Sequence, residues 1–171
     1  MRPLLVLAFG AAFLFQLVAL SLYQLPFEGL SLIAPDFVLL LVIYAAAFDR
    51  PRRGLQAAVA AACLCEVLSV QPWGAYALPY VTSAWITSRC GRKGWGDDPL
   101  PRFIVILIAV AAALGARALL LRAFGASHLL PGIYSALVTV LYDGILGTLI
   151  FSLLDPIRGR LVAPPRPRRL L

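Results

Sequence analysis

The chain has few of the side chains on which catalytic and metal sites depend. Charged residues make up 13% of its 171 residues, and it contains one histidine and three cysteines. A metal centre of histidine and cysteine ligands is therefore not expected, and this cysteine count fits neither a disulfide framework nor a zinc site. The single histidine, His128, lacks the setting of a catalytic triad, and no glycine-rich phosphate loop is present. We expect no enzymatic activity, no cofactor and no metal.

Apolar residues dominate instead. They make up 61% of the sequence, with a mean hydropathy of +0.89, whereas a soluble domain is about half apolar and about a quarter charged. A membrane-spanning helix needs about 20 residues. The candidate spans are residues 4–25, 31–48, 54–70, 73–88, 103–124 and 131–154. The sequence therefore predicts an all-α integral membrane protein, a compact bundle of about six transmembrane helices over residues 1–157, followed by a basic, proline-rich cytoplasmic tail over residues 158–171.

The formal net charge of +7 is concentrated in alternate connections. Basic residues follow the second, fourth and sixth apolar segments, and the positive-inside rule then places both termini in the cytoplasm. Nucleic-acid binding is not expected, because basic and aromatic residues do not interleave on a polar face. The fourth segment contains Pro79, Thr82, Ser83 and Thr87, so we expect it to be bent or packed inside the bundle, away from lipid.

Four charged residues lie well inside the apolar segments, namely Asp36, Glu66, Arg117 and Asp143, and a fifth, Arg122, lies close to the outer boundary. With a rise of about 1.5 Å per residue, Glu66, Arg117 and Asp143 are expected to share a layer near the membrane midplane. Arg117 then pairs with Glu66 or Asp143, or else the acids form a proton or ion site. The ion pair is favoured, because ion pathways usually carry more hydroxyl, amide or broken-helix chemistry. Asp36, beside Pro35 at the outer start of its segment, is expected to cap a helix.

Small residues form stripes at helical spacing. One stripe contains Gly54, Ala58, Ala62 and Glu66, and a second contains Ala109, Ala113 and Arg117. Because small residues let helices approach closely in lipid, we expect the third and fifth segments to pack along these stripes.

Two further glycines, Gly144 and Gly147, lie beside Asp143 in the last segment. Ordinary bundle packing is favoured for them, and a docking groove for a partner's transmembrane helix is the alternative.

Two stretches of the sequence are similar to one known family. The first is PDFVLLLVIY at residues 35–44, followed by a basic turn and Gly54; the second is EVLS at residues 66–69, followed by PWGAYAL at residues 72–78. Together they resemble the rod shape-determining protein MreD family, in which the acid of the third helix is often aspartate where this chain has Glu66. The resemblance assigns no role to Arg117 or Asp143.

The resemblance implies a non-enzymatic membrane scaffold of the bacterial elongation machinery. Such a protein lies in the inner membrane, binds MreC, and helps to couple cytoplasmic MreB to peptidoglycan synthases. Its fold is expected to be similar to that of the S-components of energy-coupling-factor transporters. A small-solute carrier or S-component is the alternative, with a polar cavity around Glu66 and Arg117, and self-association is left open. A lipid-modifying enzyme is disfavoured, because phosphoryl chemistry would require several acids arranged around metal ions.

Overall fold

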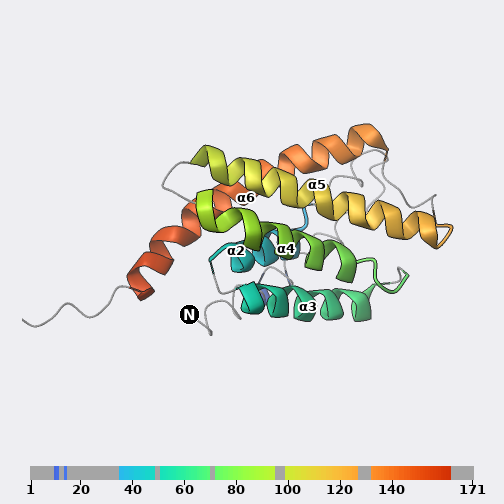
Figure 1. The fold of residues 1–171 in the computed structure, drawn as a ribbon, viewed down its shortest axis with the longest axis horizontal. Coiled ribbons are helices and arrows are strands. Elements are labelled where there is room, and N and C mark those ends of the chain that lie inside the picture. The colour runs from blue at the N-terminus through green and yellow to red at the C-terminus, as the bar shows by residue number, and fades with distance from the viewer. Residues whose placement is uncertain are drawn as a thin grey trace, which may run out of the picture.

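The computed structural model describes residues 10–11, 14, 35–48, 51–69, 72–94, 99–126 and 132–162, and all regular structure within these ranges is helical (Figure 1). The helices are α2 (Phe37–Phe48), α3 (Pro51–Leu68), α4 (Ala77–Gly94), α5 (Pro99–Ala123) and α6 (Ile133–Val162). The predicted all-α class is confirmed for this part of the chain. The first predicted span lies outside it except for helical residues 10, 11 and 14, as do His128 and residues 163–171.

Proline and glycine set several helix ends. Pro51 and Pro99 occupy the first positions of α3 and α5, where the missing N–H would have no helical partner and the fixed φ angle suits a helix. At the other end of α5, Gly125 adopts a φ of +70°. There the N–H of Ala126 donates to Leu121 O at 2.8 Å and that of Gly125 to Arg122 O at 3.0 Å. These two bonds form a Schellman motif, which satisfies carbonyls left open at the helix end.

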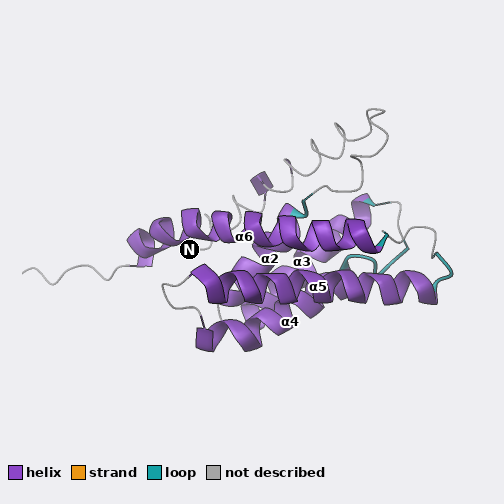
Figure 2. Cartoon of the chain, turned by 90° about the horizontal axis from the view of Figure 1, so that it is seen from above, coloured by secondary structure: helices purple, strands orange, loops and turns teal. Residues whose placement is uncertain are grey.

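Successive helices run in opposite directions, so that the ends of α2, α4 and α6 and the starts of α3 and α5 lie on the left of Figure 1. Helix α4 packs against α2, α3 and α5, and α5 lies between α4 and α6 (Figure 2). Helix α2 is the innermost element, because every residue from Val38 to Ala46 is buried. A helix that is apolar all round requires such enclosure.

The interior of the bundle combines aromatic residues of α2 and α6 with small polar residues of α4. The rings of Tyr44 and Phe151 lie 5.0 Å apart in an edge-to-face arrangement. Ser83 and Thr87 are fully buried, and their hydroxyls donate to Tyr80 O at 2.9 Å and Ser83 O at 2.7 Å. Backbone carbonyls of α4 itself thus satisfy these hydroxyls. The hydroxyl-bearing face of the fourth segment is buried in the bundle, while Leu78 and Trp85 of the same helix are exposed.

Two of the described helical stretches, Pro99–Ala123 and Ile133–Asp155, are long and apolar enough to cross a membrane. This finding rests on length and composition. Helix α2 is apolar but has only 12 residues, and it begins at Phe37 where the sequence predicted a span from residue 31. Helix α6 continues past the predicted domain boundary at residue 157 and ends at Val162.

Candidate functional site

Side chains from all five described helices, or from the turns beside them, form one polar cluster inside the bundle. We define this polar cluster as Asp36, Cys65, Glu66, Tyr76, Tyr80, Arg117 and Asp143. Four of its members are the charged residues singled out from the sequence. The other three were not predicted as site residues, because a cysteine or tyrosine in an apolar segment gives no signal that distinguishes it from ordinary core.

Asp36 caps α2, as predicted. Its Oδ1 accepts a hydrogen bond from the backbone N–H of Leu39 at 2.8 Å, which satisfies one of the free donors of the first helical turn. The Tyr80 hydroxyl of α4 donates to the same carboxylate and lies 3.0 Å from each of its oxygens. The hydroxyl hydrogen of Tyr80 is thus already donated to Asp36. The Cys65 sulfur lies 3.7 Å from the Tyr80 oxygen, so the Cys65 thiol is the donor in this contact. One buried hydroxyl therefore joins α2, α3 and α4.

Glu66 joins the end of α3 to the start of α4. Its Oε1 accepts hydrogen bonds from the backbone N–H groups of Tyr76 at 2.8 Å and Ala77 at 3.1 Å. The carboxylate thus caps the N-terminus of α4 from the preceding helix, where free N–H groups and the helix dipole both favour negative charge. The turn between the helices places Gly74 at a φ of +95°, a conformation that favours glycine.

Replacing Glu66 with alanine is expected to lower the free energy of unfolding by about 1–2 kcal/mol, since this is the usual cost of losing a cap. Glu66→Gln keeps the acceptor oxygen and is the matched control, with an expected loss of less than half as much. The measurement is reversible unfolding of the detergent-solubilised chain by titration with SDS. Equal losses for the two variants would show that the charge matters and that the hydrogen bonds do not.

Arg117 of α5 approaches the polar cluster from the other side of the same turn. Its guanidinium carbon lies 5.7 Å from the centroid of the Tyr76 ring, over its face, which is a favourable cation–π distance. The sequence predicted that Arg117 would share a layer with Glu66 and Asp143 and would pair with one of the two acids. The structure places Arg117 and Glu66 against Tyr76, one on its ring and one on its backbone N–H.

Asp143 of α6 meets the N-terminus of α2. The residue is 1% exposed, and the backbone N–H of Asp36 donates a hydrogen bond to its carboxyl group. The sequence placed Asp36 at the outer start of its segment and Asp143 near the centre of the last one. Because α2 begins only at Phe37, Asp36 lies beside Asp143, which is next to the centre of the apolar stretch Ile133–Asp155. The short helix α2 accordingly starts deep inside the bundle.

The small-residue stripes are buried, but they do not face each other. The prediction that the third and fifth segments pack together is wrong: α3 and α5 are not in contact, and α4 contacts both of them. The α3 stripe of Gly54, Ala58 and Ala62 is buried, and a Cβ added to Gly54 would lie 2.5 Å from the Cα of Ala46 in α2. Sequence periodicity identified the packed face of α3 but not the helix that packs on it.

Gly144 and Gly147 lie where α6 crosses α5 and α2. A Cβ at Gly144 would be 2.6 Å from Leu107 Cδ2, and one at Gly147 would be 3.0 Å from Leu40 Cδ2 and 3.1 Å from Ile106 Cγ2. Side chains of this chain therefore fill the space beside both glycines. They contribute close packing within the bundle.

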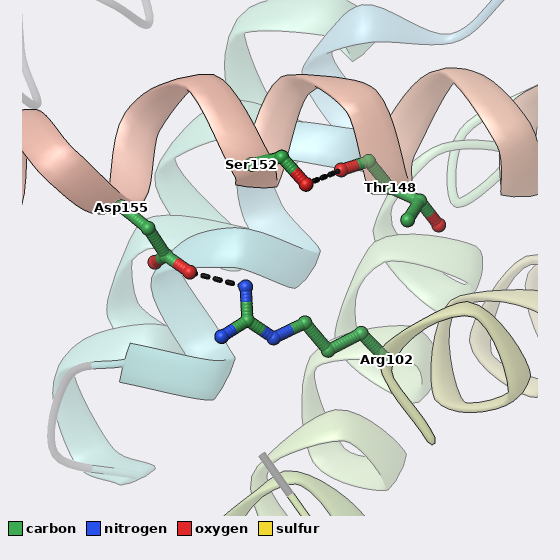
Figure 3. Close-up of polar contacts among 4 residues, drawn as sticks. All are labelled: Arg102, Thr148, Ser152 and Asp155. Atoms are coloured by element: carbon green, nitrogen blue, oxygen red, sulfur yellow. Dashed lines mark hydrogen bonds and ion pairs between the residues drawn. The ribbon is translucent and has the colours of Figure 1, made fainter. Parts of the chain in front are cut away.

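An ion pair ties the start of α5 to the far part of α6 and was not anticipated from the sequence. Arg102 Nη1 contacts Asp155 Oδ2 in a partly buried setting (Figure 3). One turn before Asp155, the Ser152 hydroxyl donates to Thr148 O at 2.9 Å. The signal available in the sequence was the opposite charge of Arg102, before the fifth apolar segment, and Asp155, after the sixth.

Within the described ranges, no group of three or more histidine, cysteine, aspartate or glutamate side chains is arranged to hold a metal ion. The side chains of the polar cluster can form hydrogen bonds, pair charges and bind protons. No protein-family model, curated protein or solved structure matches the chain.

Proposed function

We propose that the chain is a multi-pass protein of the bacterial inner membrane that acts as a non-enzymatic scaffold of the elongation machinery. In this proposal about six helices cross the membrane and both termini are cytoplasmic. The bundle binds MreC and helps to couple MreB and membrane peptidoglycan synthases, so that the cell grows as a rod.

The surface of α6 supports the membrane location. Large apolar side chains are exposed along it at every fourth position: Ile133, Leu137, Leu141, Ile145, Leu149 and Leu153. Soluble monomers rarely expose a continuous apolar surface of this kind, whereas lipid solvates it. A partner's transmembrane helix is equally apolar, and the same surface is thus available to MreC.

The distribution of charge along the bundle supports the orientation. The end of the bundle at which α3 and α5 start and α4 ends holds Arg52, Arg53, Arg89 and Arg102. At the other end, residues 72–76 contain no charged side chain, and Arg122 is the basic residue in the last turn of α5. Such asymmetry is typical of a membrane protein with its basic end in the cytoplasm.

One observation carries the assignment to the elongation machinery. The two stretches that resemble the MreD family, residues 35–44 and 66–78, are distant in sequence, yet Asp36 of the first and Glu66 and Tyr76 of the second belong to the same polar cluster. Residues from the two similar stretches are thus neighbours in the fold, and this closeness supports the proposal.

The test is purification of the affinity-tagged full chain in detergent from membranes of its native host, with a photo-crosslinking residue at the exposed position Leu141 or Leu149 of α6. We expect a crosslink to MreC and recovery of cell-wall synthases by mass spectrometry. The matched control carries the crosslinker at Ile106, which is fully buried, and should give no partner.

Depletion of the chain should also convert rod-shaped cells to spheres. Recovery of an ATPase module with a coupling subunit, in cells that keep their shape, would refute the scaffold and establish the small-solute carrier.

A further inference from the structure

Asp143 is an acidic residue in a place where an isolated negative charge is costly. It is 1% exposed, and its Oδ1 has no hydrogen-bond partner among the described residues. Removing an ionised carboxylate from water without a counter-charge costs so much that such groups are found paired, metal-bound or neutral. The structure must therefore supply Asp143 with a compensating positive charge or a proton.

A second acidic residue lies beside Asp143. It is Asp36, whose backbone N–H donates a hydrogen bond to the Asp143 carboxyl group. Asp36 itself is held as a carboxylate, because it accepts hydrogen bonds from the Leu39 N–H and the Tyr80 hydroxyl at the N-terminus of α2. Two carboxylates that share a buried site are not both ionised.

The other titratable groups of the polar cluster are engaged elsewhere. On α3 and α4, Glu66 caps α4 and the Tyr80 hydroxyl is donated to Asp36. Cys65 contacts Tyr80, and the guanidinium of Arg117 on α5 lies over the Tyr76 ring. A metal ion is disfavoured as the compensating charge, since the described residues provide no group of three acidic, histidine or cysteine ligands.

From this geometry we infer that Asp143 binds a proton in the folded chain, and that the contact between α6 and the N-terminus of α2 is a proton-binding site. The Asp36 N–H bond is compatible with this state, since a neutral carboxyl group still accepts a hydrogen bond on its carbonyl oxygen. Loss of the proton would place two negative charges side by side in the interior, so proton occupancy controls how firmly α2 docks on α6. The inference does not depend on which partner the chain binds.

The first experiment uses dicyclohexylcarbodiimide, which reacts with protonated carboxyl groups in apolar surroundings, followed by mass spectrometry of the full chain in detergent. Asp143 is expected to be labelled at neutral pH, with labelling lost as the pH rises, whereas Glu66, whose Oε1 accepts hydrogen bonds from two backbone N–H groups, is expected to stay unlabelled. Labelling at Glu66 without labelling at Asp143 would overturn the inference.

The second experiment does not require the reagent to reach the interior. The thermal midpoint is measured against pH for the wild-type chain and for Asp143→Asn, a neutral variant of the same shape. If the folded state binds a proton that the unfolded state releases, stability falls as pH rises, so the wild-type midpoint should decline with increasing pH relative to that of Asp143→Asn. If the midpoints of the two chains changed in parallel with pH, or if Asp143→Asn failed to fold, the inference that Asp143 binds a proton would be refuted. The inference would also be refuted if the wild-type midpoint rose with sodium concentration at constant pH and that of Asp143→Asn did not, since the site would then bind a cation.

Discussion

An alanine at position 54 is expected to lower the free energy of unfolding by about 1–3 kcal/mol, the usual cost of forcing extra volume into a packed interior. The added Cβ would lie 2.5 Å from the Cα of Ala46, and a backbone atom cannot rotate away as the end of a long side chain can. Helices α2 and α3 would have to separate. Unfolding in SDS measures the loss, and Gly54→Leu should prevent recovery of a monodisperse bundle.

Gly115 is the matched control for this prediction. It also lies within a helix, α5, but a Cβ there would meet nothing within 4 Å. Gly115→Ala should leave stability unchanged or raise it by up to about 1 kcal/mol, because alanine is the better helix former. If both alanine variants behaved alike, helix propensity alone would explain them, and the close approach of α2 and α3 would be wrong.

Removal of either partner of the Arg102–Asp155 pair is expected to cost about 1–3 kcal/mol. A fully buried pair broken on one side costs about 3–5 kcal/mol, and the figure here is lower because the side chains are 13% and 24% exposed. Arg102→Met and Asp155→Leu each leave one charge without its partner at the α5–α6 contact. Unfolding free energies of the two variants are the measurement.

The double variant Arg102→Met/Asp155→Leu separates this effect from a simple loss of packing. Apolar residues of similar size can replace a buried ion pair at little cost, so the double variant should recover to within about 1 kcal/mol of the wild type. Losses that instead add up in the double variant would mean that the two residues act independently.

Local sequence signals predicted local structure well. Pro35-Asp36 before an apolar run indicated the cap of α2, and the hydroxyls of the fourth segment indicated a face that is buried in the bundle. Helix ends were predicted less well, because an apolar window stops at the first polar residue, whereas a helix continues until its backbone is interrupted. Helix α4 thus reaches Gly94, beyond the predicted end at residue 88.

The choice of neighbouring helices could not be read from the sequence. The stripe of Gly54, Ala58 and Ala62 faces inward as expected. Such a stripe can pack against any helix with a smooth face, and the arrangement of the whole bundle determines that this helix is α2. The same limit applies to Tyr80. Its hydroxyl donates to Asp36 only because the start of α2 lies beside it, and the sequence did not show that α2 begins as late as Phe37.

The shortness of α2 has a consequence for how the protein is made. Twelve helical residues span about 18 Å, less than the hydrocarbon thickness of about 30 Å, and every side of the helix is covered by other parts of the chain. The α5 and α6 stretches can enter the bilayer from the translocon as independent hydrophobic units. Because α3 and α4 provide much of the surface that encloses α2, we expect α2 to dock only after these two helices are in place.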